Sequence, residues 1–321
     1  MQTIIITNNE AGQRTDKFLR KLLPQTPLGE IYKMLRTKKI KINGKKTEPK
    51  YQLQVNDIIN IYQEITVKKA AKIPQSDNWH NLKIIYEDQE ILIVDKPCGI
   101  LTHPAARQEK NSLIQQCLSY LAEKQEYLPE QETTFTPAAC NRLDRNTSGL
   151  VIIAKTFPAL QTVNALIREK KISKYYLALV KGSIKQSGEI KGFLSKDQTT
   201  NTVKVHAESK PESKEIHTFY QPLFTNDFAS LLEINLLTGR THQIRAHLAS
   251  IGHPLAGDRK YGEANFNQYF LEKYHLKHQF LHAYKLVFPP SSPLLAEKTI
   301  TAALPTELKH IKNKAFPKNH P

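Results

Sequence analysis

Asp144 is the carboxylate whose surroundings in the sequence best suit chemistry. It lies between Arg142 and Arg145 in the segment CNRLDRNTSGLVIIAKT (140–156), where Thr-Ser-Gly leads into an apolar run. Neighbouring guanidinium groups favour an ionised carboxylate, and a strand that begins just after a turn fixes the turn residues in place. Asp144 is therefore a candidate nucleophile or general base. A turn cap or a structural ion pair uses the same residue types, so this segment alone leaves both readings open.

A second segment, LLTGRTHQIRAHLASIGHPLAGDRKYG (236–262), gathers polar side chains where an expected strand ends and an expected helix begins. Its polar members there are Arg240, His242, Gln243, Arg245 and His247. Polar groups at the start of a helix suit an anion or a nucleotide. A capped helix with solvated arginines is the alternative, and the density of Arg, His and Gln favours the binding site.

Two shorter segments hold further candidates. Tyr176 lies in SKYYLALVKG, an expected strand, where a tyrosine is either part of the core or an aromatic surface for a ligand. The turn KPCGILTHP (96–104) offers Lys96 and His103, which either contact a substrate or serve the structure.

The elements that must position these residues show a mixed pattern. Strands are expected on both sides of a turn within residues 83–97, and again at 151–156, 174–182 and 231–239, with a helix over 157–171. Strands dominate and do not alternate regularly with helices. The pattern therefore predicts an α+β fold with a mixed, mainly antiparallel central sheet and flanking helices, not a doubly wound sheet.

Positive charge is concentrated near the N-terminus. The chain of 321 residues has 46 Lys and Arg against 30 Asp and Glu, a net charge of +16. Residues 12–74 alone hold 15 of the basic and 5 of the acidic residues. Such a balance favours a polyanionic partner. No apolar run approaches the roughly 20 residues that span a bilayer, so no membrane association is expected.

Residues 12–64 form a small α/β module in this reading. We expect a helix capped by Thr15 or Asp16, a second helix starting at 28–30, a hairpin turn at Asn43-Gly44 and a strand at 57–62. The stretches RTDKFL (14–19) and IYKMLRTKKIKINGK (31–45) resemble the αL-type RNA-binding module of a small-subunit ribosomal protein and of bacterial tyrosyl-tRNA synthetases. The resemblance implies phosphate contacts through the basic residues Arg36, Lys38, Lys39 and Lys41.

The larger part of the chain resembles the RluA family of RNA pseudouridine synthases. The motif R-L-D-x-x-T-S-G-L is whole at 142–150, and K-x-Y-x-A-x-V-x-G is whole at 174–182. The run G-R-T-H-Q-I-R-x-H-L, G-H-P-L and G-D-x-x-Y-G follows at 239–262, and LHA at 281–283. Four motifs in this order, over about residues 83–290, make the resemblance highly specific.

The resemblance assigns roles residue by residue. Asp144 matches the catalytic aspartate, and Tyr176 matches the tyrosine that stacks on the target base. Arg245 matches the arginine that pairs with the aspartate, and Arg142 matches the arginine linked to holding the place of the flipped-out nucleotide. Asn141 departs from the family pattern, which has histidine before R-L-D.

The implied reaction breaks the N1–C1′ bond of a uridine, turns the uracil and joins C5 to C1′. It involves no redox change, so no cofactor is required, and the histidine and cysteine spacings predict no metal site. The base must leave its stack to react, and a tyrosine can hold it there by stacking. Asp144 would act at the ribose, either by attack on C1′ or by abstraction of a proton.

These expectations divide the chain into an RNA-binding module (12–64), a linker (65–80), a catalytic domain (81–306) and a basic, disordered tail (307–321). The appended module favours large-subunit (23S) ribosomal RNA as substrate. A tRNA-modifying enzyme and a non-catalytic RNA-binding or ribosome-assembly factor are the alternatives. We expect a cytoplasmic monomer, because the N-terminus lacks the features of a secretory signal.

Overall fold

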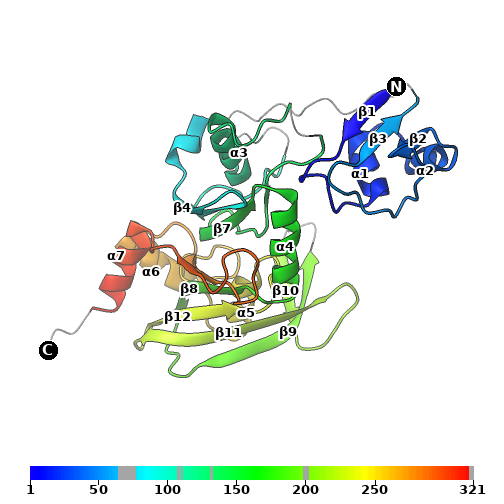
Figure 1. Ribbon diagram of the computed structural model, residues 1–321. Helices are drawn as coiled ribbons and strands as arrows, with labels where there is room; N and C mark the ends of the chain where they lie inside the picture. Colours follow the sequence, from blue (N-terminus) through cyan, green and yellow to red (C-terminus); the bar gives the residue numbers. More distant parts are fainter. Residues whose placement is uncertain (64–76, 107–108, 110, 131–132, 198–201, 318–321) are drawn as a thin grey trace.

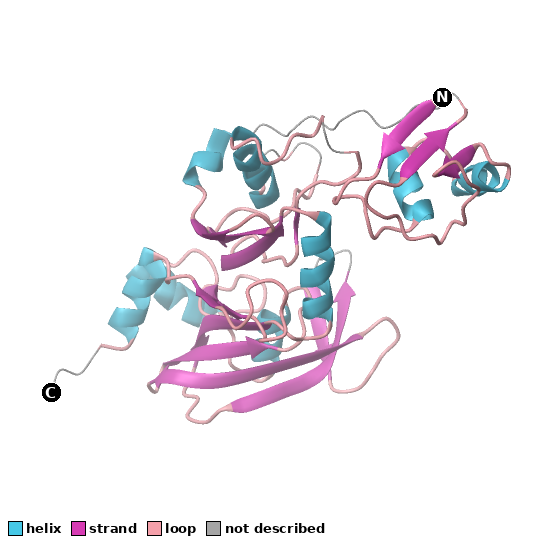
Figure 2. Cartoon of the chain, in the orientation of Figure 1, coloured by secondary structure: helices cyan, strands magenta, loops and turns pink. Residues whose placement is uncertain are grey.

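The computed structural model describes residues 1–63, 77–106, 109, 111–130, 133–197 and 202–317, and these residues form two separate sheets (Figures 1 and 2). The smaller sheet belongs to an N-terminal module, and the larger sheet to the main domain. The elements of the module are β1 (Gln2–Ile5), α1 (Thr15–Leu22), α2 (Leu28–Arg36), β2 (Ile40–Ile42) and β3 (Ile58–Ile61).

The N-terminal module is built around the apolar faces of its two helices. Phe18 and Leu22 of α1 pack with Met34 of α2 against isoleucines of β2 and β3. The turn at Asn43-Gly44 has the positive φ angles expected for such a pair, 52° and 74°. The helices and the turn therefore form where the apolar spacing and the turn residues predict them.

Two details of the module differ from the prediction. Strand β1 pairs antiparallel with β3, so the sheet of the module also includes residues 2–5, which precede the predicted range 12–64. The N-cap of α1 is Arg14, whereas Thr15 and Asp16 lie inside the first helical turn. Asp16 instead accepts a hydrogen bond from Arg14 Nη2 at 2.7 Å, because an acidic side chain in the first helical turn lies close to the N-cap residue.

The main domain contains one long, mostly antiparallel sheet. Its strand order is β10-β9-β11-β12-β8-β13-β7-β5-β4 within the described residues, with β14 beside β13 and β6 beside β7. The strands are β4 (Ile84–Glu87), β5 (Ile91–Lys96), β6 (Ala138–Ala139), β7 (Ser148–Ala154), β8 (Ser173–Lys181), β9 (Gly188–Asp197), β10 (Thr202–His206), β11 (Lys214–Thr225), β12 (Ala229–Leu236), β13 (Leu281–Val287) and β14 (Thr299–Thr301). The predicted α+β class and mainly antiparallel sheet are confirmed.

Helices cover both faces of this sheet. They are α3 (Leu113–Glu123), α4 (Phe157–Arg168), α5 (Gln243–Ser250), α6 (Ala264–Tyr274) and α7 (Thr306–Ala315). Successive residues of β5 pack on different sides, Leu92 with α3 and Ile93 with α4, so this strand is buried on both faces. A strand of this kind reads as a continuous apolar run, as β5 does. None of the described helices is long and apolar enough to cross a membrane.

Strands β7 and β13 meet in parallel beside Asp144, and their contact requires a glycine. Gly149 has a φ of +118°, and a Cβ there would lie 2.2 Å from the backbone oxygen of Ala283. Any other residue would therefore push the two strands apart. The glycine of the T-S-G motif thus sets the position of the strand that follows the loop carrying Asp144.

Both ends of the main domain extend further than the sequence predicts. Residues 77–80, assigned to the linker, belong to the 3₁₀ helix η1 (Asp77–Asn81), where Trp79 contacts Tyr120 of α3 at 6.1 Å between ring centroids. The expectation of a disordered tail over 307–321 is wrong for residues 307–315, which belong to a helix that starts at Thr306. They form α7, because Leu308 and Ile311 are spaced along one helix face and bury against α6 and β8. Residues 64–76 and 318–321 lie outside the described residues.

The segment between β1 and α1 contacts the main domain. Asn9 Oδ1 accepts a hydrogen bond from the backbone N–H of Phe157, the first residue of α4, at 3.2 Å. Glu10 is fully buried and accepts from the backbone N–H of Thr134 at 3.4 Å. The module therefore lies beside the N-terminal end of α4, as Figure 1 shows.

Candidate active site

Asp144 lies in the loop between β6 and β7, and the segment 96–102 holds this loop on its far side. Lys96 is fully buried and donates from Nζ to the backbone oxygen of Arg145 at 3.1 Å. Thr102 bonds both the N–H and the C=O of Leu143, each at 3.1 Å. Hydrogen bonds therefore hold the backbone on both sides of Asp144, and this fixed backbone limits where the Asp144 carboxylate can lie.

Asp144 faces a cavity, and Lys96 is not among the residues that line it. Lys96 is thus a structural residue. Its ammonium also donates to the backbone oxygens of Pro97 and Ile100, at 3.0 and 2.9 Å. Burial lowers the pKa of Lys96 to about 8. His103 is exposed and lies outside the residues that line that cavity. Of the two readings of the segment 96–104, the structural one is therefore correct for Lys96.

Arg245, on α5, joins Asp144 to a second carboxylate. Its Nη1 donates to Asp144 Oδ2 at 3.0 Å, while Nε and Nη2 donate to Asp258 Oδ2 and Oδ1 at 2.7 and 2.9 Å. Asp258 is fully buried. A bidentate pair fixes the plane of the guanidinium, so Asp258 aims the remaining N–H of Arg245 at Asp144.

The charges of this triad stabilise one another. Burial alone would raise the pKa of Asp258, but the hydrogen bonds and charge of Arg245 hold it below its usual range. Burial would likewise lower the pKa of Arg245, and the two carboxylates raise it instead. Asp258 and Arg245 are therefore both charged at neutral pH, and the guanidinium offers Asp144 a fixed cationic partner.

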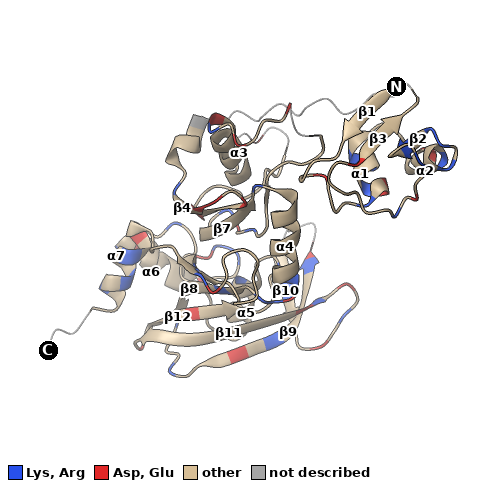
Figure 3. Ribbon diagram, viewed as in Figure 1, with Lys and Arg blue, Asp and Glu red and all other residues tan. Residues whose placement is uncertain are grey.

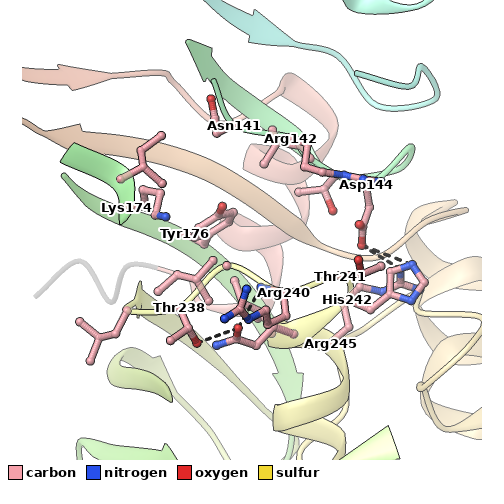
Figure 4. Close-up of a pocket in the computed structure, with 18 of the residues that line it drawn as sticks. Asn141, Arg142, Asp144, Lys174, Tyr176, Thr238, Arg240, Thr241, His242 and Arg245 are labelled. Carbon is pink, nitrogen blue, oxygen red and sulfur yellow. Dashed lines mark hydrogen bonds and ion pairs between the residues drawn. The ribbon is translucent and has the colours of Figure 1, made fainter. Parts of the chain in front are cut away.

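His242 approaches Asp144 from another direction, with 3.8 Å between Nε2 and Oδ2 (Figure 4). Its Nδ1 lies 3.0 Å from the hydroxyl of Tyr261, which also accepts from the backbone N–H of Val203 at 2.8 Å. Burial is the main cause that lowers the pKa of His242, so the ring is neutral at neutral pH. In the tautomer with its proton on Nε2, the ring accepts from the Tyr261 hydroxyl at Nδ1 and its N–H faces Asp144.

The backbone at His242 supports this arrangement. Its φ of 54° is left-handed, which is uncommon for a residue other than glycine, and His242 is the N-cap of α5. Gln243 fastens the loop before it, since its Oε1 accepts from the N–H of Arg240 at 3.1 Å and its Nε2 donates to Thr218 Oγ1 at 3.0 Å. Such conformations cluster at functional sites.

Tyr176 forms a wall of the same cavity. It lies on β8, and its side chain is 6 % exposed. Burial and the neighbouring Asp144 carboxylate raise the pKa of Tyr176, so its hydroxyl stays protonated. The ring is thus a neutral aromatic surface near the carboxylate, as stacking on a base requires.

The cavity measures about 500 Å³. It is bounded by the Asp144 loop, the end of α4, β8 and the loop before α5 (Figure 4). Arg142 is exposed and lines it together with Arg168, Lys170, Lys174 and Arg240, whereas Asp144 is the acidic member of the described lining. An opening with this charge attracts a polyanion.

Asn141 has a structural task. Its Oδ1 accepts from the backbone N–H of Ile152 at 2.8 Å, and its Nδ2 donates to the oxygen of Leu150 at 3.2 Å. Both partners lie on β7, so Asn141 ties the start of the Asp144 loop to the strand that follows it.

The structure thus brings Asp144, Tyr176, Arg245 and Arg142 to one cavity, as the resemblance implies. It places Arg36, Lys38, Lys39 and Lys41 elsewhere, on α2, β2 and the turn between them, in the part of the module farthest from the main domain in Figure 3. The first three are exposed and Lys41 is half-buried. They form a separate basic surface.

The sequence assigned no role to Asp258 or Tyr261, and it placed His242 only among the polar residues of an expected binding site. The motifs G-D-x-x-Y-G and G-R-T-H-Q-I-R contained them, but only the folded chain shows that they meet around Arg245 and Asp144. Among the described side chains, no group of three or more His, Cys, Asp or Glu is arranged to hold a metal ion.

Comparisons with known proteins agree with this geometry. Residues 90–250 match the family model of RNA pseudouridylate synthase, and residues 13–59 match that of the S4 domain. A ribosomal large subunit pseudouridine synthase C of Haemophilus ducreyi is 34 % identical over 97 % of this chain and 94 % of its own. An uncharacterised RNA pseudouridine synthase of Mycoplasma genitalium is also 34 % identical, over 89 % of this chain and 88 % of its own.

A solved structure shows the same fold. Human RNA pseudouridylate synthase domain containing 4 superposes with a TM-score of 0.55 at 23 % identity, over 71 % of this chain and 90 % of its own. Both resemblances seen in the sequence are therefore confirmed. The chain belongs to the RNA pseudouridylate synthase family and carries an S4 domain ahead of the domain that holds Asp144.

Proposed function

We propose that the protein converts uridine to pseudouridine in large-subunit (23S) ribosomal RNA, as a cytoplasmic monomer. The observation that carries the proposal is the Asp144 carboxylate, held at a cavity by Arg245, which is itself fixed by buried Asp258. A protein that only bound RNA would have no use for an acidic residue held at the cavity that its ligand enters, because RNA phosphates are themselves negatively charged. Relatives named for the large ribosomal subunit favour that substrate.

Each site residue has a task in this reaction. The target nucleotide leaves its helix and enters the cavity, where Tyr176 stacks on the uracil and Arg142 occupies the space that the base has left. Asp144 acts at the ribose, as nucleophile at C1′ or as base, while the N1–C1′ bond breaks. The uracil turns, C5 bonds to C1′, the C5 proton leaves and N1 gains a proton.

Arg245 and His242 serve Asp144. Arg245 donates to the Asp144 carboxylate and orients it, since Asp258 fixes the plane of the guanidinium from the other side. Neutral His242 presents an N–H to the same oxygen at 3.8 Å, and that contact can shorten when substrate excludes water. The S4 domain holds the RNA away from the cavity through Arg36, Lys38, Lys39 and Lys41, which contact phosphates.

The substrate is tested by mapping pseudouridine after incubation with unmodified RNA. Purified protein is incubated with 23S ribosomal RNA transcripts and, separately, with a full set of tRNA transcripts. Pseudouridines are then located by carbodiimide labelling and primer extension. Defined sites in ribosomal RNA alone are the expected result. Sites in tRNA alone would keep the chemistry and overturn the substrate.

A further inference from the structure

Lys174 is a cation in the cavity that the reaction described so far does not use. It is the second residue of β8, two residues before Tyr176, and alternate residues of a strand face the same side. Both side chains line the cavity, as Figure 4 shows. The motif K-x-Y thus places an ammonium group next to the proposed stacking surface.

The ammonium of Lys174 has no partner of its own. Within the described part of the chain it makes no hydrogen bond or ion pair. Asp144, the acidic residue of the lining, is held by Arg245 instead. Burial lowers the pKa of Lys174, with no nearby carboxylate to oppose it. Folding has therefore half-buried a cation without giving it a partner among the described residues, and an anion in the cavity would supply one.

The surroundings of Lys174 indicate which anion this is. Its Nζ lies against the loop that carries Arg240, 3.7 Å from the position a Cβ would take at Gly239. Arg168 and Lys170, at the end of α4, line the same opening. A group of cations around one cavity suits the phosphates of a strand that enters with its nucleotide turned inward. A neutral uracil oxygen would compensate a buried charge much less well.

We propose that Lys174 binds a phosphate of the RNA strand next to the flipped uridine, and so anchors the backbone while the uracil detaches and turns. This inference rests on the proposed function, because the anion is a part of that substrate. Lys174 acts on binding and on position, and Asp144 retains the chemistry.

The test combines a change in the protein with a change in the RNA. The protein is compared with Lys174→Met, which keeps an unbranched stem without charge, and with Lys174→Arg. The matched control is Lys181→Met, at the other end of β8, where Lys181 pairs with Glu263 at 3.1 Å outside the cavity. The substrates are synthetic hairpins around a mapped uridine, each with one phosphate near it replaced by a neutral methylphosphonate.

We expect Lys174→Met to lower kcat/KM by about 10- to 100-fold on unmodified RNA, the effect of losing one charge-assisted contact. One methylphosphonate should lower the wild-type value similarly and have no further effect on Lys174→Met. Lys174→Arg should retain most activity, and Lys181→Met all of it. The melting temperature of Lys174→Met should be unchanged or higher, because a desolvated cation has been removed.

Two results would overturn the inference. If every methylphosphonate affected wild type and Lys174→Met equally, the partner of Lys174 would not be a phosphate. If Lys174→Met matched wild type on unmodified RNA, Lys174 would have no role in the reaction. Turnover by wild type separates this outcome from a failure of the proposed function, since a wild type that left unmodified RNA unchanged would refute both.

Discussion

The Arg245→Lys variant separates charge from position at Asp144. Arg245 makes three N–H contacts that point in two directions, two toward Asp258 and one toward Asp144. A lysine keeps the positive charge but has a single nitrogen, which cannot bridge two carboxylates in this geometry. Because Asp258 is fully buried and would be left uncompensated, the ammonium should pair with Asp258 and leave Asp144 without a fixed partner.

The size of the effect follows from the contact that is lost. A hydrogen bond between charged groups contributes about 1.5–3 kcal/mol. If the bond between Arg245 and Asp144 operates fully in the transition state, its loss lowers kcat by about 10- to 150-fold. KM should change little, because the Arg245 side chain is only 7 % exposed and offers almost no surface to RNA.

The assay is single-turnover isomerisation of the ribosomal RNA substrate at saturating enzyme. RNA affinity is measured in parallel by filter binding, and the fold is checked by thermal melting. A variant with normal affinity and melting but a rate within about threefold of wild type would refute the reasoning, because Asp144 would then work without its bridged partner.

Three further predictions concern stability and binding. Burial lowers the pKa of His247 to about 4. As the pH falls from 6.5 to 4, the unfolded state therefore binds a proton at His247 before the folded state does, and the free energy of unfolding decreases. In urea unfolding over this range, His247→Gln should lose about 2–3 kcal/mol less than wild type, and equal losses would exclude His247 as the cause. Gly149→Ala should prevent folding or destabilise the main domain severely, since its Cβ would lie 2.2 Å from Ala283, and wild-type melting would contradict the close approach of β7 and β13. Deletion of residues 1–63 should weaken RNA binding and flatten its dependence on salt, because phosphate contacts release counterions; an unchanged slope in filter binding would show that the module does not hold RNA.

Much of the local structure was predictable because local patterns encode it. The continuous apolar run of β5 and the Asn43-Gly44 turn each depend on residues close in sequence. The expected hairpin within residues 83–97 appears as β4 and β5 for the same reason.

The elements that escaped prediction depend on distant partners. Strand β1 forms because β3 pairs with it, and nothing in the sequence of residues 2–5 indicates that β3 is the partner. The lysines of α7 give the segment a basic composition. Leu308 and Ile311 are buried against α6, and this burial stabilises the segment as a helix. A basic composition was read as a solvated tail, whereas only one face of the helix is solvated.

The sequence predicts which residues belong to the candidate site but not the hydrogen bonds and ion pairs that connect them. The resemblance brought Asp144 and Arg245 together although 101 residues separate them, which spacing alone does not indicate. Asp258 had no predicted role, and the sequence left the role of Lys96 open between substrate contact and structure. A buried charge is recognised by the partners it finds in the folded chain, and these lie 13 residues away for Asp258 and 49 for one carbonyl that Lys96 bonds.

The central claim is that Asp144 carries the chemistry of uridine isomerisation. The most direct measurement is the release of tritium from ribosomal RNA labelled at uridine C5, with wild type and Asp144→Asn compared at equal RNA occupancy. We expect release by wild type, no release by Asp144→Asn, and nearly equal RNA affinity for both. Release by Asp144→Asn at a rate near that of wild type would contradict the claim.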